Sequence, residues 1–113
     1  MIKSGGAAGT LIVQTRLTEG EIRNNHFHLT GYLDRFPGDL IGGRNVSVMA
    51  PKEASIDWGG DTEALTDIDE VHRFFRRRGW VRQFFELTGA EAGDWVLVEE
   101  TGSYRYKVSL KKA

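Results

Sequence analysis

The sequence contains no cysteine, which excludes disulfides, thiolate zinc sites and cysteine nucleophiles. Long hydrophobic runs are also missing: the longest, Leu11–Val13 and Trp95–Val98, are far too short for a transmembrane helix. The first residues are followed by a Gly- and Ala-rich stretch, so residues 1–9 predict a flexible tail and no signal peptide. We therefore expect a cytoplasmic protein without a membrane partner.

Neither sign of charge dominates the chain. Fifteen Lys and Arg oppose sixteen Asp and Glu, which leaves a net charge of −1. A nucleic-acid partner would therefore require basic residues gathered on one face. The 113 residues are 40% hydrophobic and 27% charged, close to average globular usage, which excludes disorder, collagen and coiled coil. This length predicts one domain with a substantial core, over residues 10–113.

Short β-branched or alternating segments predict several strands. These segments are Thr10–Leu17, His26–Thr30, Asn45–Ala50, Ala54–Trp58 and Asp67–Phe75. The polar segment Thr18–Asn25 carries a glycine and an Asn pair and predicts a loop. Tyr32–Phe36 predicts a short helical turn ahead of Pro37.

The clearest helix is predicted over Gly79–Thr88, where Trp80, Phe84 and Leu87 recur at helical spacing and Gly89 suits a C-terminal cap. A closing β-hairpin is predicted from the alternation of Trp95–Glu99 and Tyr104–Leu110. Six or seven short strands with one or two short helices indicate a mainly β fold, either a barrel or a sandwich.

Catalytic motifs are missing: the chain has no Gly-rich phosphate loop, no His-Glu-x-x-His and no nucleophile elbow. His26 and His28 share a strand face, and so do Asp67 and Asp69, so a metal-dependent enzyme is one alternative. Solvent-facing or hydrogen-bonded histidines are the commoner case. We expect no catalytic residue, no metal and no cofactor.

The distribution of basic residues says more about function than the search for catalytic motifs. Five of the fifteen fall within ten residues, at Arg73, Arg76, Arg77, Arg78 and Arg82. Arg16 and Arg23 flank the polar loop. Such clustering suits phosphate neutralisation, and arginine and asparagine are residue types that read base edges. The alternative is a solvated face with acidic neighbours such as Glu70 and Glu86.

The order Gly79-Trp80, Phe84, Gly93-Asp94 and then an apolar strand resembles plant B3 transcription-factor domains. Upstream motifs resemble a bacterial group, the N-terminal effector-binding domains of EcoRII-type restriction endonucleases. These motifs are Asn25-His26-Phe27-His28-Leu29, Phe36-Pro37, Ile41-Gly42-Gly43 and Thr66-Asp67-Ile68-Asp69. The resemblance covers about residues 10–110, and its specific part is the block from Gly79 to Asp94.

The resemblance implies an open seven-stranded DNA-binding pseudobarrel with a helix at each end. It also implies two arms that grip the DNA major groove, here Gln14–Asn25 and about Asp57–Asp69. The implied base-reading residues are Arg16, Glu19, Arg23, Asn24 and Asn25 on the first arm and Trp58, Asp61 and Thr62 on the second. The phosphate candidates are Arg76, Arg77 and Arg78.

From the sequence we thus expect a non-catalytic module that binds double-stranded DNA sequence-specifically. It would be a recognition or effector domain of a restriction–modification system, or a stand-alone relative, with a nuclease domain or subunit as a further partner. The alternative is a protein-interaction module on the same barrel without DNA binding. That alternative is favoured by the nearly neutral chain and by the acidic second arm at Asp61 and Glu63.

Overall fold

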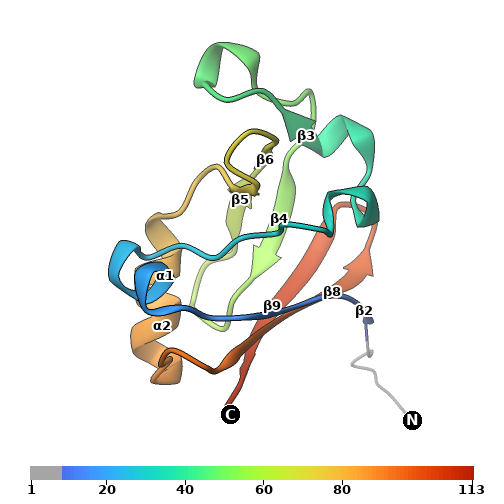
Figure 1. Ribbon diagram of the computed structural model, residues 1–113. Helices are drawn as coiled ribbons and strands as arrows, with labels where there is room; N and C mark the ends of the chain where they lie inside the picture. The colour runs from blue at the N-terminus through green and yellow to red at the C-terminus, as the bar shows by residue number, and fades with distance from the viewer. Residues whose placement is uncertain (1–8) are drawn as a thin grey trace, which may run out of the picture.

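The computed structural model describes residues 9–113, which form two sheets and two short α-helices (Figure 1). The five-stranded sheet has the order β2-β8-β9-β4-β5. Its strands are β2 (Thr10–Arg16), β8 (Trp95–Gly102), β9 (Arg105–Lys111), β4 (Ala54–Asp57) and β5 (Ala64–Thr66). All neighbours are antiparallel except β4 and β9, which are parallel.

The second sheet has three short strands in the order β3-β6-β7. They are β3 (Ile41–Gly42), β6 (Ile68–Asp69) and β7 (Phe74–Phe75). Three 3₁₀ turns complete the described elements: η1 (Leu33–Arg35), η2 (Gly38–Leu40) and η3 (Val46–Val48). Most of the regular structure is sheet, so the expected mainly β fold class is confirmed. Across residues 9–113 the strands do not close into a barrel.

Helix α2 (Gly79–Thr88) has the predicted bounds. It buries Trp80, Val81, Phe84 and Phe85 against the sheets and leaves its other face in solvent, as its hydrophobic spacing requires. Gly89 ends the helix in the left-handed conformation, with φ of 65°. The predicted β8–β9 hairpin is also confirmed.

The predicted loop at Thr18–Asn25 is wrong, because these residues form α1 (Glu19–Asn24). The Thr18 side chain accepts a hydrogen bond from the Glu21 backbone N–H (3.1 Å), and the Glu21 carboxylate accepts one from the Thr18 N–H (2.9 Å). This reciprocal pair is a capping box, and its Thr-x-x-Glu spacing was readable in the sequence. Asn25 ends the helix with φ of 53°.

Three predicted strands are also corrected. Residues 26–29 run extended beside β7, with the Leu29 N–H donating to the Arg73 carbonyl (2.6 Å), but they belong to neither sheet. Asn45–Ala50 contains η3 instead of a strand. Asp67–Phe75 is a β6–β7 hairpin whose turn places Arg73 at φ of 61°. The predicted alternation of 26–29 nevertheless holds, since the apolar side chains are buried and the histidines half-exposed.

The expected tail at residues 1–8 lies outside the described residues. Gly9 lies against β8, where a Cβ would come 2.7 Å from the Glu100 carbonyl oxygen. In the part of the chain that the structure describes, no helix is long and apolar enough to cross a membrane.

Candidate nucleic-acid interface

The ring of Phe74, at the start of β7, is surrounded by basic side chains from three segments. The His72 ring stacks on it almost in parallel, with centroids 5.2 Å apart and planes 7° apart. The rings of His26 and His28 approach it to 5.2 and 5.8 Å. The Arg78 guanidinium carbon lies 4.1 Å from its centroid. One largely buried aromatic ring thus organises four basic groups.

Two shallow pockets flank this cluster, one beside α1 and β2 and the other beside the segment that follows β3. Together with the cluster they form a continuous surface, which we call the basic face. It comprises Arg16, Asn24, His26, His28, Arg44, Asn45, His72, Phe74 and Arg78.

The carboxylate beside the first pocket is turned inward. Glu21 is 6% exposed. Its Oε1 accepts from the Thr18 N–H, and its Oε2 accepts from the His28 N–H (2.8 Å) and lies 2.9 Å from His28 Nδ1. The Glu21 carboxylate therefore does not face solvent, and its hydrogen bonds join α1 to the 26–29 segment.

The carboxylate beside the second pocket is turned inward as well. Asp69 is 3% exposed, and its Oδ1 accepts from the backbone N–H groups of Val71 and His72. Its Oδ2 lies 2.7 Å from His72 Nδ1. Burial alone would raise the pKa of Asp69, but the hydrogen bonds from His72 and Val71 outweigh it and lower the pKa. The ionised carboxylate orients the His72 ring on Phe74.

The arginine run separates into paired and unpaired members. Arg76 is engaged internally: its Nε lies 2.6 Å from Asp67 Oδ1, and its Nη2 donates to Asp67 Oδ2 (3.0 Å) and to the Gly43 carbonyl (2.7 Å). The hydrogen bond with Asp67 raises the pKa of Arg76 despite burial. Because the Asp67 side chain is 0% exposed, Arg76 and Asp67 form a buried ion pair.

Two exposed arginines of the run also have carboxylate partners. Arg77 lies 3.4 Å from a Glu53 carboxylate oxygen, and Arg82 lies 3.5 Å from one of Glu86. Within residues 9–113, six arginines have no carboxylate oxygen within 4.0 Å: Arg16, Arg23, Arg35, Arg44, Arg73 and Arg78. Three of these six, Arg16, Arg44 and Arg78, belong to the basic face, so its arginine charge is available to an anionic partner.

Two first-arm candidates reach the basic face. Arg16 donates from Nε to the Gly93 carbonyl (3.2 Å), and its guanidinium lies over the Trp95 ring at 5.7 Å. Asn24 lines the pocket beside α1. The other three candidates, Glu19, Arg23 and Asn25, lie on α1 or at its C-terminal end and do not line that pocket.

The second-arm candidates lie on a different surface. Trp58, Asp61 and Thr62 form the β4–β5 turn, which packs against α2. The Trp58 Nε1 donates to the Thr62 carbonyl (3.1 Å), and the Trp58 ring lies 6.4 Å from that of Trp80. The structure therefore brings the β6–β7 turn, with His72, next to the first arm, instead of the β4–β5 turn.

Four residues of the basic face were missed from the sequence as binding candidates: Arg44, Asn45, His72 and Phe74. His26 and His28 were considered only as metal ligands. Partial burial lowers the pKa of His26, and charge repulsion from the basic neighbours His28 and Arg78 lowers it further. In the described part of the chain, no group of three or more His, Asp or Glu side chains is arranged to hold a metal ion.

Comparisons with protein families, curated proteins and solved structures found no match for this chain. We therefore infer the function from the geometry of the basic face and from the motifs in the sequence.

Proposed function

We propose that this chain is a non-catalytic module that binds double-stranded DNA through its basic face. The observation that carries the proposal is a separation of charge. Arg16, Arg44 and Arg78 have no carboxylate partner, whereas both acidic residues that line the face are buried and hydrogen-bonded. A chain of net charge −1 thereby presents a positive surface on which neither carboxylate that lines the two pockets is exposed.

The chemistry of the face suits both parts of duplex recognition. Arg44 and Arg78 are placed to hold phosphates, which position a protein on DNA without reading its sequence. Arg16 offers guanidinium donors, and Asn24 offers an amide whose Nδ2 also donates to the Gly20 carbonyl (2.9 Å); such groups distinguish base edges in the major groove. Arg76, also a phosphate candidate from the sequence, is left out of this role in the proposal because Asp67 and Gly43 engage its Nε and Nη2 donors and the side chain is largely buried.

The fold assigned in the proposal is a B3-like open pseudobarrel, related to the effector-binding domains of EcoRII-type restriction endonucleases. The motifs around Gly79-Trp80 and Gly93-Asp94 support it, together with the β-rich architecture. A restriction–modification context and a nuclease partner follow from the same resemblance, and the proposed location is the cytoplasm.

The proposal is tested by selection from a random duplex library at about 50 mM salt, followed by a salt titration of the enriched site. We expect an enriched motif whose affinity falls steeply with salt. The paired change Arg44→Ala and Arg78→Ala should weaken binding about tenfold or more and reduce the salt slope by about two, one for each lost phosphate contact.

Arg82→Ala is the matched control, because Arg82 lies in the same arginine run but pairs with Glu86 on the exposed side of α2. It should bind like the parent chain. Absence of any duplex retention at low salt would overturn the proposal. If Arg82→Ala and the Arg44/Arg78 variant lost equal amounts of duplex affinity, the basic face would not be the DNA-binding surface.

A further inference from the structure

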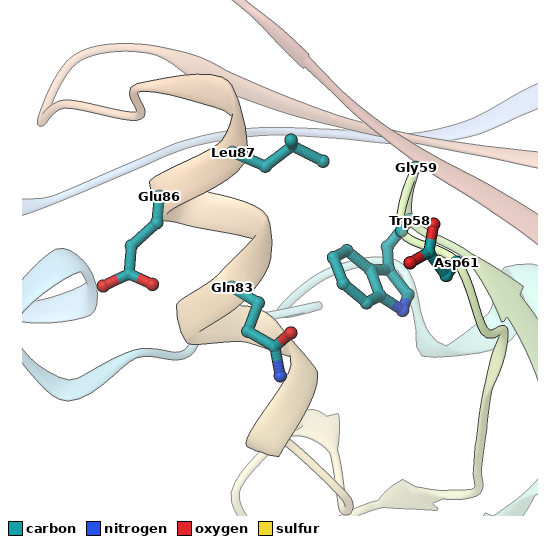
Figure 2. A pocket seen from close by; sticks show the side chains of 7 residues that line it. Trp58, Gly59, Asp61, Gln83, Glu86 and Leu87 are labelled. Carbon is teal, nitrogen blue, oxygen red and sulfur yellow. The ribbon is translucent and has the colours of Figure 1, made fainter.

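A second surface lies between the β4–β5 turn and α2, and we call it the acidic groove (Figure 2). On one side of Trp58 it is lined by Gly59, Gly60, Asp61, Gln83, Glu86 and Leu87. It continues on the other side of Trp58 along Thr62, Glu63, Ala64 and Trp80. It shares no lining residue with the basic face.

Every titratable group that lines the groove is acidic, namely Asp61, Glu63 and Glu86. Two of these are countered at the rim: Glu86 lies 3.5 Å from Arg82, and Glu63 lies 3.7 Å from Arg105. Asp61 has no cationic group within 4.0 Å among residues 9–113. Figure 2 shows the Asp61 carboxylate beside the Trp58 indole, whereas Glu86 points away from it.

The walls of the groove are apolar and held in place. Leu87 is 61% exposed, and Figure 2 shows its side chain extending from α2 toward the turn. The Trp58 indole is fixed by the bond from its Nε1 to the Thr62 carbonyl. Gly60 packs so closely on the indole that a Cβ there would collide with the ring. The aromatic wall is thus in place before any partner arrives.

We propose that the acidic groove binds a segment of a partner protein that carries a lysine or arginine next to an apolar side chain. The cation would lie between the Asp61 carboxylate and the Trp58 ring, where charge and the ring quadrupole both attract it. The apolar neighbour would cover Leu87. Charge complementarity selects this occupant, because the Asp61 carboxylate, which has no cationic partner among residues 9–113, attracts a cation and repels a phosphate backbone. DNA on the basic face and a protein in the groove can therefore be bound together.

The test uses the full chain as bait against a random peptide library displayed on phage, without DNA present. Enriched peptides should carry positive charge and an apolar residue. Asp61→Lys should weaken their binding by about tenfold or more, because it reverses the charge beside the indole. Leu87→Ser should weaken it about threefold through lost apolar contact.

Asp34→Lys makes the same charge change at another exposed position and should leave peptide binding unchanged. Circular dichroism of each variant separates loss of binding from loss of fold. Enrichment of neutral or acidic peptides, no enrichment, or binding that survives Asp61→Lys would each overturn the proposal. Loss of peptide binding can be told apart from loss of DNA binding. We expect Asp61→Lys to leave duplex affinity unchanged and the Arg44/Arg78 change to lower it.

Discussion

The guanidinium carbon of Arg78 lies 4.1 Å from the centre of the Phe74 ring, close enough for a cation–π contact. The His72 ring is stacked on the same aromatic ring. Arg78 is the N-cap residue of α2, so its backbone is fixed by the helix and its side chain by the ring. The structure therefore holds an unpaired arginine in one orientation at the centre of the basic face.

Replacing Phe74 by leucine tests this arrangement. Phe74→Leu keeps an apolar residue of similar size but removes the aromatic face that orients Arg78 and His72. A cation–π contact is worth roughly 0.5–2 kcal/mol, so we expect duplex affinity to fall by about 3- to 30-fold. Stability should change by less than about 1.5 kcal/mol. Fluorescence anisotropy and urea unfolding measure the two quantities, and unchanged affinity would contradict the proposed role of the ring.

The buried Arg76–Asp67 pair should stabilise the fold without contributing to DNA binding. Arg76→Ala leaves the Asp67 carboxylate, whose side chain is 0% exposed, without its cationic partner. Breaking a buried pair in this way costs about 3–5 kcal/mol, which urea unfolding can measure. The exposed neighbouring change Arg77→Ala should cost less than about 1 kcal/mol. A folded, fully stable Arg76→Ala protein that no longer binds DNA would show that Arg76 contacts DNA after all.

Duplex binding should tighten as the pH falls. The groups that face His26 are His28, Arg78, Glu21 and the Phe74 ring. Burial first, and then charge repulsion from His28 and Arg78, lower the pKa of His26 below 6.5, against the opposing effect of Glu21. His26 is therefore mostly neutral at pH 7 and gains its proton only under more acidic conditions. Because DNA favours the protonated ring, the gain in affinity appears as the pH falls through this range and vanishes above it. In His26→Asn the rise in duplex affinity with falling pH, measured at fixed salt, should be smaller than in the parent protein. An identical pH profile would show that protonation of His26 does not contribute to binding.

Acid should destabilise the protein partly through Asp94. The hydrogen bond from Lys112 lowers the pKa of Asp94 to about 2, helped by the N–H groups of Ala113 and Glu91 and opposed by burial. Since the folded pKa is below the unfolded value of 3.8, this contribution is complete above pH 3.8 and is lost as the pH falls toward 2. Asp94→Asn should lower Tm at neutral pH and flatten the fall in Tm across that window. A variant with the parent's acid profile would refute this assignment.

The elements predicted well from the sequence are those encoded locally. The spacing of Trp80 and Phe84 and the stop at Gly89 are sufficient for α2, because each acts within a few residues. The capping box of Thr18 and Glu21 was equally local, but the polar composition and Gly20 favoured a loop. The even step from Ile68 to Phe74 fits one strand as well as a hairpin, and a left-handed Arg73 is not a turn signal that sequence patterns provide.

The candidate site was less predictable, because it depends on tertiary pairing. The run from Arg73 to Arg82 looks uniform in the sequence. Partners on other segments decide which of its charges are free: Asp67 engages Arg76, and Glu53 engages Arg77. Arg44 reaches the basic face only because the segment after β3 lies beside the β6–β7 turn. No local pattern contains that information.

The place of β9 in its sheet has a consequence for how the molecule is made. β9 follows every other strand that the structure describes, yet it lies between β8 and β4 and is the only link between the two halves of the five-stranded sheet over residues 9–113. During synthesis the β4–β5 hairpin can form early, but it cannot join β2 until the β8–β9 hairpin has emerged. Until then β4 exposes an unpaired edge of the kind that aggregates. Completion of this sheet therefore waits for the last strand to leave the ribosome, and a chain shortened before β9 would leave β4 and β5 separated from β2 and β8.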